Sequence, residues 1–152
     1  MAAGFVAAGV MSTARLLAHR AGLIDRMVPQ VLQERAAGEA GMDLPGGKAG
    51  HQLAAEVIHH GVSLAAGGLL GTVSARPRTL TAVAYGLGIW LVEAGGLLPA
   101  LRVRRLSPRA LAVDAAAHAL FGVVVAFAMR ELASQERLKP VPTKVPFLRR
   151  VG

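Results

Sequence analysis

The amino-acid sequence predicts an all-α integral membrane protein, folded as a four-helix antiparallel bundle with an amphipathic helix after the first span. Three observations predict this class. The composition is 53% hydrophobic over only 152 residues, which is more apolar than an ordinary soluble domain of this size. Three long segments are almost free of charged residues, and the basic residues gather beside these segments, where they can face lipid headgroups.

The clearest spans are residues 57–75, 80–101 and 110–129. They contain 19, 22 and 20 residues. At about 1.5 Å per residue each helix is roughly 30 Å long, which is the thickness of the hydrocarbon core of a bilayer. Glu93 and Asp114 are the only formally charged residues within them. The basic connections between these spans are short, so neighbouring spans should be antiparallel.

The first span is predicted over residues 1–18, where the apolar run ends near Arg15 and that side chain snorkels toward the membrane surface. A cleaved signal peptide is the alternative, although no basic residues precede the apolar run. Apolar residues then recur at helical spacing to about Glu34, with an interruption near Pro29. This spacing indicates an amphipathic helix that continues the first span, lies along the headgroups, or packs on the protein as a loop helix.

The remaining segments divide the chain into one domain and a tail. Residues 38–50 form a glycine-rich linker, residues 1–132 a single transmembrane helical domain, and residues 133–152 a basic, proline-containing tail that should be extended from Gln135 onward. No cysteine is present, which excludes disulfides and thiolate metal sites.

The net charge of +8 would also suit a nucleic-acid-binding protein, but only six aromatic side chains are available for base stacking. The clustering of basic residues beside apolar segments favours lipid instead. We therefore predict that the partners are membrane lipid, with further copies of the chain or other membrane proteins, and not nucleic acid.

Three spans each carry one line of polar and small residues on a single helical face, because the members follow one another at intervals of three or four residues. The lines comprise Glu56, His60, Ser63, Gly67 and Gly71 in the second span, Gly86, Trp90 and Glu93 in the third, and Asp114, His118, Gly122 and Ala126 in the fourth. Small residues let helices approach closely in lipid, and ionisable groups avoid hydrocarbon. The lines should therefore face one another inside the bundle, with helix contacts at Gly67, Gly71 and Gly122.

The ionisable residues of these lines fall in the same half of the membrane when depth is counted from the side that carries the first long loop. We therefore expect one polar cluster in that half, formed by Arg15, Glu56, His60, Glu93, Asp114 and His118. His59 should turn away from this cluster, because adjacent residues on a helix point about 100° apart.

A family resemblance rests on three stretches, "HHGVSLAAGGLLG", "GLGIWLVEAGGLLPAL" and "AVDAAAHALFGVVVAFAMREL". Together they resemble the YagU-like family of small bacterial inner-membrane proteins over residues 56–132. Matching by motif places His60 with Gly61, Pro99, and His118 with Gly122 on the positions of that family. The resemblance implies a polytopic helical fold and a multi-pass location in the bacterial inner membrane, and it implies no defined biochemical role.

Two classes of function fit these residues. The first is an accessory, scaffold or structural membrane protein whose buried polar cluster holds the helices together. The alternative is a proton or metal-ion carrier or channel, because histidine titrates near neutrality and intramembrane carboxylates often mark ion paths. No catalytic residue is predicted, and no cofactor except, in the alternative, a divalent metal ion with the candidate ligands Glu56, His59, His60, Glu93, Asp114 and His118.

Overall fold

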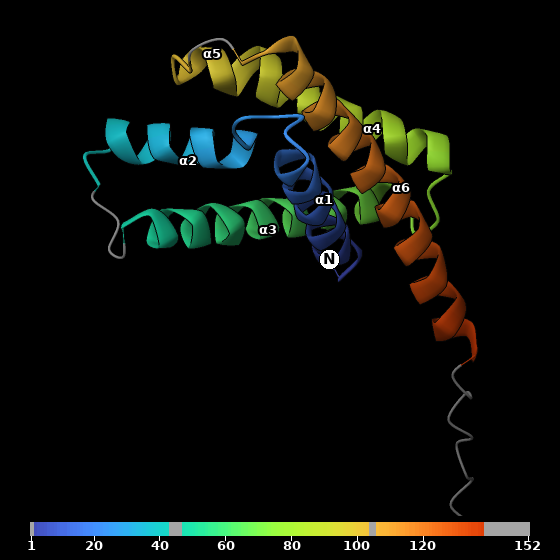
Figure 1. Ribbon diagram of the computed structural model, residues 1–152. Helices are drawn as coiled ribbons and strands as arrows, with labels where there is room; N and C mark the ends of the chain where they lie inside the picture. Colours follow the sequence, from blue (N-terminus) through green and yellow to red (C-terminus); the bar gives the residue numbers. More distant parts are fainter. Residues whose placement is uncertain (1, 43–46, 104–105, 139–152) are drawn as a thin grey trace, which may run out of the picture.

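The computed structural model describes residues 2–42, 47–103 and 106–138, and the regular structure in these ranges is entirely helical (Figure 1). The prediction of an all-α protein is therefore confirmed. The elements are α1 (Ala2–Arg20), α2 (Val28–Glu39), α3 (Gly47–Val73), α4 (Thr79–Val92), the π-helical η1 (Glu93–Leu97), α5 (Leu98–Ala100) and α6 (Pro108–Leu138).

Three helices are long and apolar enough, by length and composition, to cross a membrane, which indicates a membrane protein. They are Ala49–Val73, Thr79–Ala100 and Pro108–Gln135. The predicted first span, α1, has 19 residues but is not among these three. Arg15, His19 and Arg20 lower its apolar character. A four-helix membrane bundle therefore stays a prediction.

Helix boundaries differ from the predicted ones at two places. α3 begins at Gly47, so the end of the glycine-rich segment at residues 38–50 is helical. α6 continues to Leu138, so the prediction of an extended tail is wrong for residues 135–138. These residues consist mostly of strong helix formers, and Gln135 Nε2 donates a hydrogen bond of 3.1 Å to Glu131 Oε1. The rest of the predicted tail lies outside the described residues.

The segment after α1 forms a turn and a separate helix instead of one interrupted helix. α1 ends at Arg20, Gly22 follows with a φ of 69°, and α2 begins at Val28. A positive φ is readily adopted by glycine. Pro29 lies in the first turn of α2, where its missing N–H would have no helical partner anyway, so it starts this helix without breaking it.

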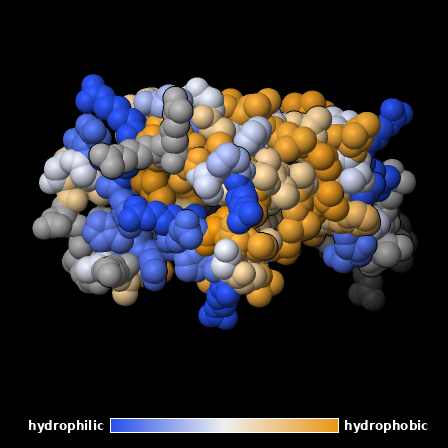
Figure 2. All heavy atoms as spheres, turned by 45° about the horizontal axis from the view of Figure 1, so that its top comes forward, coloured by the Kyte–Doolittle hydropathy of each residue, from blue (hydrophilic) through white to orange (hydrophobic). Residues whose placement is uncertain are grey.

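α1 lies between α3 and α6, α4 packs along α6, and α2 lies against α3 (Figure 1). The core between these helices consists mostly of small and aliphatic residues, namely Ala3, Ala7, Met11, Leu70, Ala82, Ala117, Phe121, Val125 and Ala126. Apolar residues also cover much of the outer face in Figure 2, whereas hydrophilic residues gather mainly toward the two ends. Large side chains such as Leu80 and Val73 are 81% exposed, which suits helices surrounded by lipid.

Glycines allow the closest helix contacts. A Cβ on Gly67 would lie 2.7 Å from Gly4 Cα, and a Cβ on Gly122 would lie 2.7 Å from Val83 Cα. Both distances are too short for real carbon atoms, so α3 approaches α1, and α6 approaches α4, only because these residues are glycine. Gly71 differs from its predicted role, because its Cβ would meet only Met129 Cε, at an ordinary contact distance of 3.4 Å.

Pro99 explains the π-helical segment η1. Its ring nitrogen carries no hydrogen, so it cannot donate to the carbonyl four residues earlier, and its ring crowds that carbonyl. The helix widens by one residue just before it, and the N–H of Leu98 donates to the carbonyl of Glu93. The helix then continues to Ala100, so Pro99 neither ends the span nor breaks it.

Candidate polar site at the junction of three helices

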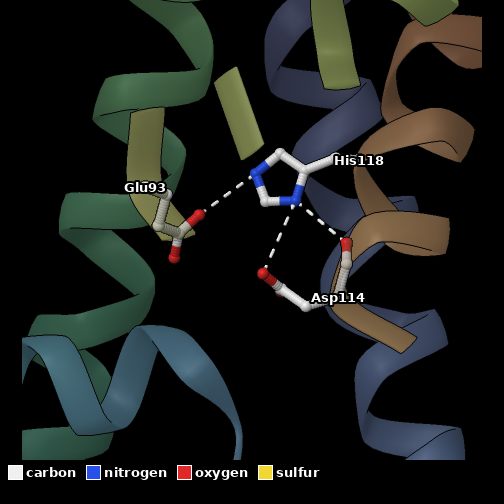
Figure 3. A group of neighbouring side chains, drawn as sticks. All are labelled: Glu93, Asp114 and His118. Carbon is white, nitrogen blue, oxygen red and sulfur yellow. Dashed lines mark hydrogen bonds and ion pairs between the residues drawn. The ribbon is translucent and has the colours of Figure 1, made fainter. Parts of the chain in front are cut away.

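Four ionisable side chains from three parts of the fold meet inside the protein. Arg15 comes from α1, Glu93 from the first residue of η1, and Asp114 and His118 from successive turns of α6. Because α6 residues four apart share a face, its carboxylate and imidazole both point toward α1 and η1. These are four of the six residues of the predicted polar cluster, and from here on the name polar cluster means these four alone. Figure 3 shows the imidazole between the two carboxylates.

The contacts within the polar cluster form a chain. Arg15 Nη2 donates to Asp114 Oδ1 in a buried ion pair. His118 Nε2 lies 3.2 Å from Glu93 Oε2. On the other side of the ring, His118 Nδ1 lies 3.0 Å from the carbonyl oxygen of Asp114 and 3.8 Å from its Oδ2. The imidazole therefore links the carboxylate of η1 to the ion pair between α1 and α6.

Burial makes this pairing necessary. Arg15, Asp114 and His118 are each 3% exposed, and an unpaired charge at such a position costs several kcal/mol. One positive and one negative charge cancel in the pair of Arg15 with Asp114. His118 has polar neighbours on both sides of its ring, because Nε2 faces Glu93 Oε2 while Nδ1 faces the Asp114 carbonyl oxygen and, at 3.5 Å, Arg15 Nη2.

Glu56 and His60 form a second, separate group at the contact of α3 with α1. Ser12 Oγ donates a hydrogen bond of 2.8 Å to Glu56 Oε2. His60 Nδ1 lies 2.9 Å from the Glu56 carbonyl oxygen, and its ring centroid lies 5.1 Å from that of Phe5. The structure thus divides the predicted cluster of six residues into two separate groups. The physical reason is that α1 lies between α3 and α6, so this face of α3 meets α1 instead of Glu93 and Asp114.

His59 also differs from its prediction. It does not turn away from the polar cluster but lines a cavity together with Glu93 and His118. The ring planes of His59 and His60 are 86° apart, as expected for neighbours on a helix. Only one of them can face α1, and the structure gives that place to His60.

The cavity has a volume of about 560 Å³ and lies between α2, α3 and the segment from α4 to η1. Its wall is mostly apolar. The polar members of the wall are Gln33, His59, Ser63, Glu93 and His118. Gln33 was not predicted to belong to a site. The sequence did place it in an amphipathic segment, and the apolar face of such a segment must pack against something, which was the one indication of a contact there.

Three of the six predicted metal candidates come together. Glu93, Asp114 and His118 offer ligand atoms that all lie within 4.8 Å of one another. One of these carboxylates is already paired with Arg15. A divalent cation at these three ligands would therefore have to share Asp114 with the guanidinium of Arg15.

Comparisons with protein-family models, with curated proteins and with solved structures give no significant match to this chain. The resemblance to the YagU-like family stays a prediction. The function is therefore inferred from the geometry of the site.

Proposed function

We propose that this chain is a four-span protein of the bacterial inner membrane with an accessory or scaffold role, in which the polar cluster holds the helices together. The observation that carries the proposal is the chain of contacts from Arg15 through Asp114 and His118 to Glu93. It joins α1 to α6 through the ion pair of Arg15 with Asp114, and α6 to η1 through the contact of His118 with Glu93. Buried polar contacts of this kind hold membrane helices in one arrangement.

The same contacts support α1 as the fourth span. With 19 residues the helix is about 28 Å long, which nearly matches the hydrocarbon core. An isolated arginine in the middle of a membrane helix costs about 2.5–3.5 kcal/mol. Arg15 is paired with Asp114 and lies in the last part of α1, and both features reduce that cost.

The glycine contacts and the exposed apolar surface support a role in assembly. Gly61, Gly88 and Gly95 have open space where a Cβ would be, so their helices could be approached closely by another helix. Further copies of the chain or other membrane proteins are the partners that we propose, besides lipid. The location in the inner membrane follows from the resemblance to the YagU-like family.

The proposed role of the polar cluster predicts a specific pattern of stability. Arg15→Gln or Asp114→Asn leaves one buried charge without its partner, which costs about 3–5 kcal/mol. The double variant removes both charges and should recover part of this loss. Arg20→Gln, which changes an exposed residue of the same helix, is the matched control. Unfolding of the detergent-solubilised chain measures all four variants, and single variants as stable as Arg20→Gln would contradict the proposal.

A proton or ion carrier is the second candidate, and the position of His118 is the observation that favours it. Both ring nitrogens face oxygen atoms, so a proton can be held on either side of the ring. The apolar core of Leu70, Phe121 and Val125 provides no polar relay beyond the cluster. A pH-flux assay in proteoliposomes tests transport, and metal analysis of wild type and Glu93→Gln tests a bound cation. Flux or stoichiometric metal that this substitution abolishes would favour the carrier.

A further inference from the structure

The cavity beside the polar cluster contains two polar groups whose hydrogen-bonding capacity is not used. Gln33 is 7% exposed, and its Oε1 has no hydrogen-bond partner among the described residues. The same holds for His59 Nε2, which is also buried. Both residues line the cavity, one from α2 and the other from α3. Leaving such a group unsatisfied costs about 1–3 kcal/mol.

The size and lining of the cavity suit a small amphiphile. Its volume of about 560 Å³ lies within the range of roughly 300–1,000 Å³ that is usual for small-molecule sites. Leu32, Ile58 and Phe121 are among the apolar residues of its wall. Water could satisfy the two polar groups but would wet the apolar wall, whereas a molecule with a hydrocarbon body and a polar head satisfies both.

The charges beside the cavity indicate that the head of such a molecule is uncharged. Arg15 pairs with Asp114 and Glu93 contacts His118, so each of these charged side chains already has a partner within the protein. A charged group in an apolar cavity without a counter-ion is strongly disfavoured. The two unused groups are instead suited to a hydroxyl, which can donate to Gln33 Oε1 and bond to His59 Nε2.

The π-helical segment borders this cavity. Glu93 and Leu97, the first and last residues of η1, both line the cavity. Single π-helical turns within longer helices occur frequently at functional sites. Here the turn brings a carboxylate to the wall of a cavity that is otherwise mostly apolar.

We propose that this cavity binds an uncharged, hydroxyl-bearing amphiphile, with its head at Gln33 and His59 and its hydrocarbon body against the apolar wall. A quinol and an acylglycerol share this chemistry, and either of them is a possible source of the ligand. This binding function goes beyond the structural role of the polar cluster, because Gln33 and His59 lie outside that cluster.

The test is equilibrium binding of radiolabelled 1-decanoylglycerol to the purified full chain in amphipol, which contributes no hydroxylated detergent. Saturable binding is expected on the native chain. Decylubiquinol and unlabelled 1-decanoylglycerol should both displace the label, and the stronger competitor identifies the source. Decyl sulfate and decyltrimethylammonium, which have chains of the same length and charged heads, should displace it much less. This comparison requires no substitution.

Two variants locate the site. Gln33→Leu removes the buried acceptor and should weaken binding about tenfold, the effect of one hydrogen bond. Ala54→Phe fills part of the cavity wall and should abolish saturable binding. The matched controls are Gln135→Leu and Ala84→Phe, which change exposed residues elsewhere. The proposal is overturned by absence of saturable binding, by equal displacement with charged competitors, or by variants that bind as their controls do.

Discussion

The contact between α4 and α6 should be sensitive to a single methyl group at Gly122. A Cβ at this position would lie 2.7 Å from Val83 Cα, whereas ordinary contacts begin at 3.4 Å. The obstacle is backbone, which cannot rotate away as a side chain can. The Ala82 carbonyl lies nearer still, so the two helices must separate by at least roughly 0.7 Å, and a gap of that size forfeits a quarter to a half of the dispersion energy of each atom pair. We expect Gly122→Ala to lower the free energy of unfolding by about 1–3 kcal/mol.

The same separation should disturb the polar cluster. Glu93 follows α4 directly, and its carboxylate lies 3.2 Å from His118 Nε2 on α6. Moving the two helices apart by roughly 0.7 Å lengthens this contact beyond hydrogen-bond distance. Gly122→Ala therefore weakens both the packing and one polar link, although the new methyl group touches neither residue of that link.

Titration with dodecyl sulfate, followed by the fluorescence of the single tryptophan, measures this effect on the purified chain. Gly88→Ala is the matched control, because it adds the same methyl group to a helical position with nothing within 4 Å. Gly88→Ala should unfold at the wild-type dodecyl sulfate fraction or slightly above it, since alanine favours a helix over glycine. Equal unfolding midpoints for the two variants would refute the packing argument.

Three further predictions follow from the same contacts. Tags fused to the two termini should be accessible from the same side of the membrane if α1 is a fourth span, and protease protection in oriented vesicles measures this. Tyr85→Phe should cost about 0.5–1.5 kcal/mol in the dodecyl sulfate titration, because the hydroxyl donates a bond of 2.9 Å to the Ala66 carbonyl. Glu56→Gln should destabilise the chain less than Glu93→Gln in that assay, because the Glu56 side chain is 41% exposed and the Glu93 side chain only 13%.

The arrangement of residues on one helix could be predicted from the sequence because helical geometry alone determines it. Asp114, His118 and Gly122 follow at four-residue steps, and the structure places all three on the buried side of α6. Three helices could likewise be located from the sequence, because a helix needs about 20 apolar residues to cross a bilayer. Neither prediction requires knowledge of a neighbouring helix.

The partner of each face could not be predicted in this way. α3 presents His60 on one side and His59 on another, and the sequence does not say which side meets α1. Helical face and depth together placed Glu56 with Glu93, but neither of them shows that α1 lies between α3 and α6. The π-helical turn was not predicted. Pro99 is compatible with a bend, a helix end or a widened turn, and the contacts with neighbouring helices determine which of these three forms.

The position of Glu93 connects the two proposals. Its carboxylate lies 3.2 Å from His118 Nε2, and the same residue lines the cavity. The ion pair of Arg15 with Asp114 lies on the other side of the imidazole, and neither of its members is among the residues that line the cavity. A hydroxyl-bearing ligand in the cavity can therefore approach Glu93 without contacting the ion pair that joins α1 to α6. The proposed helix junction and the proposed ligand site thus meet at Glu93 and His118 while the ion pair belongs to the junction alone.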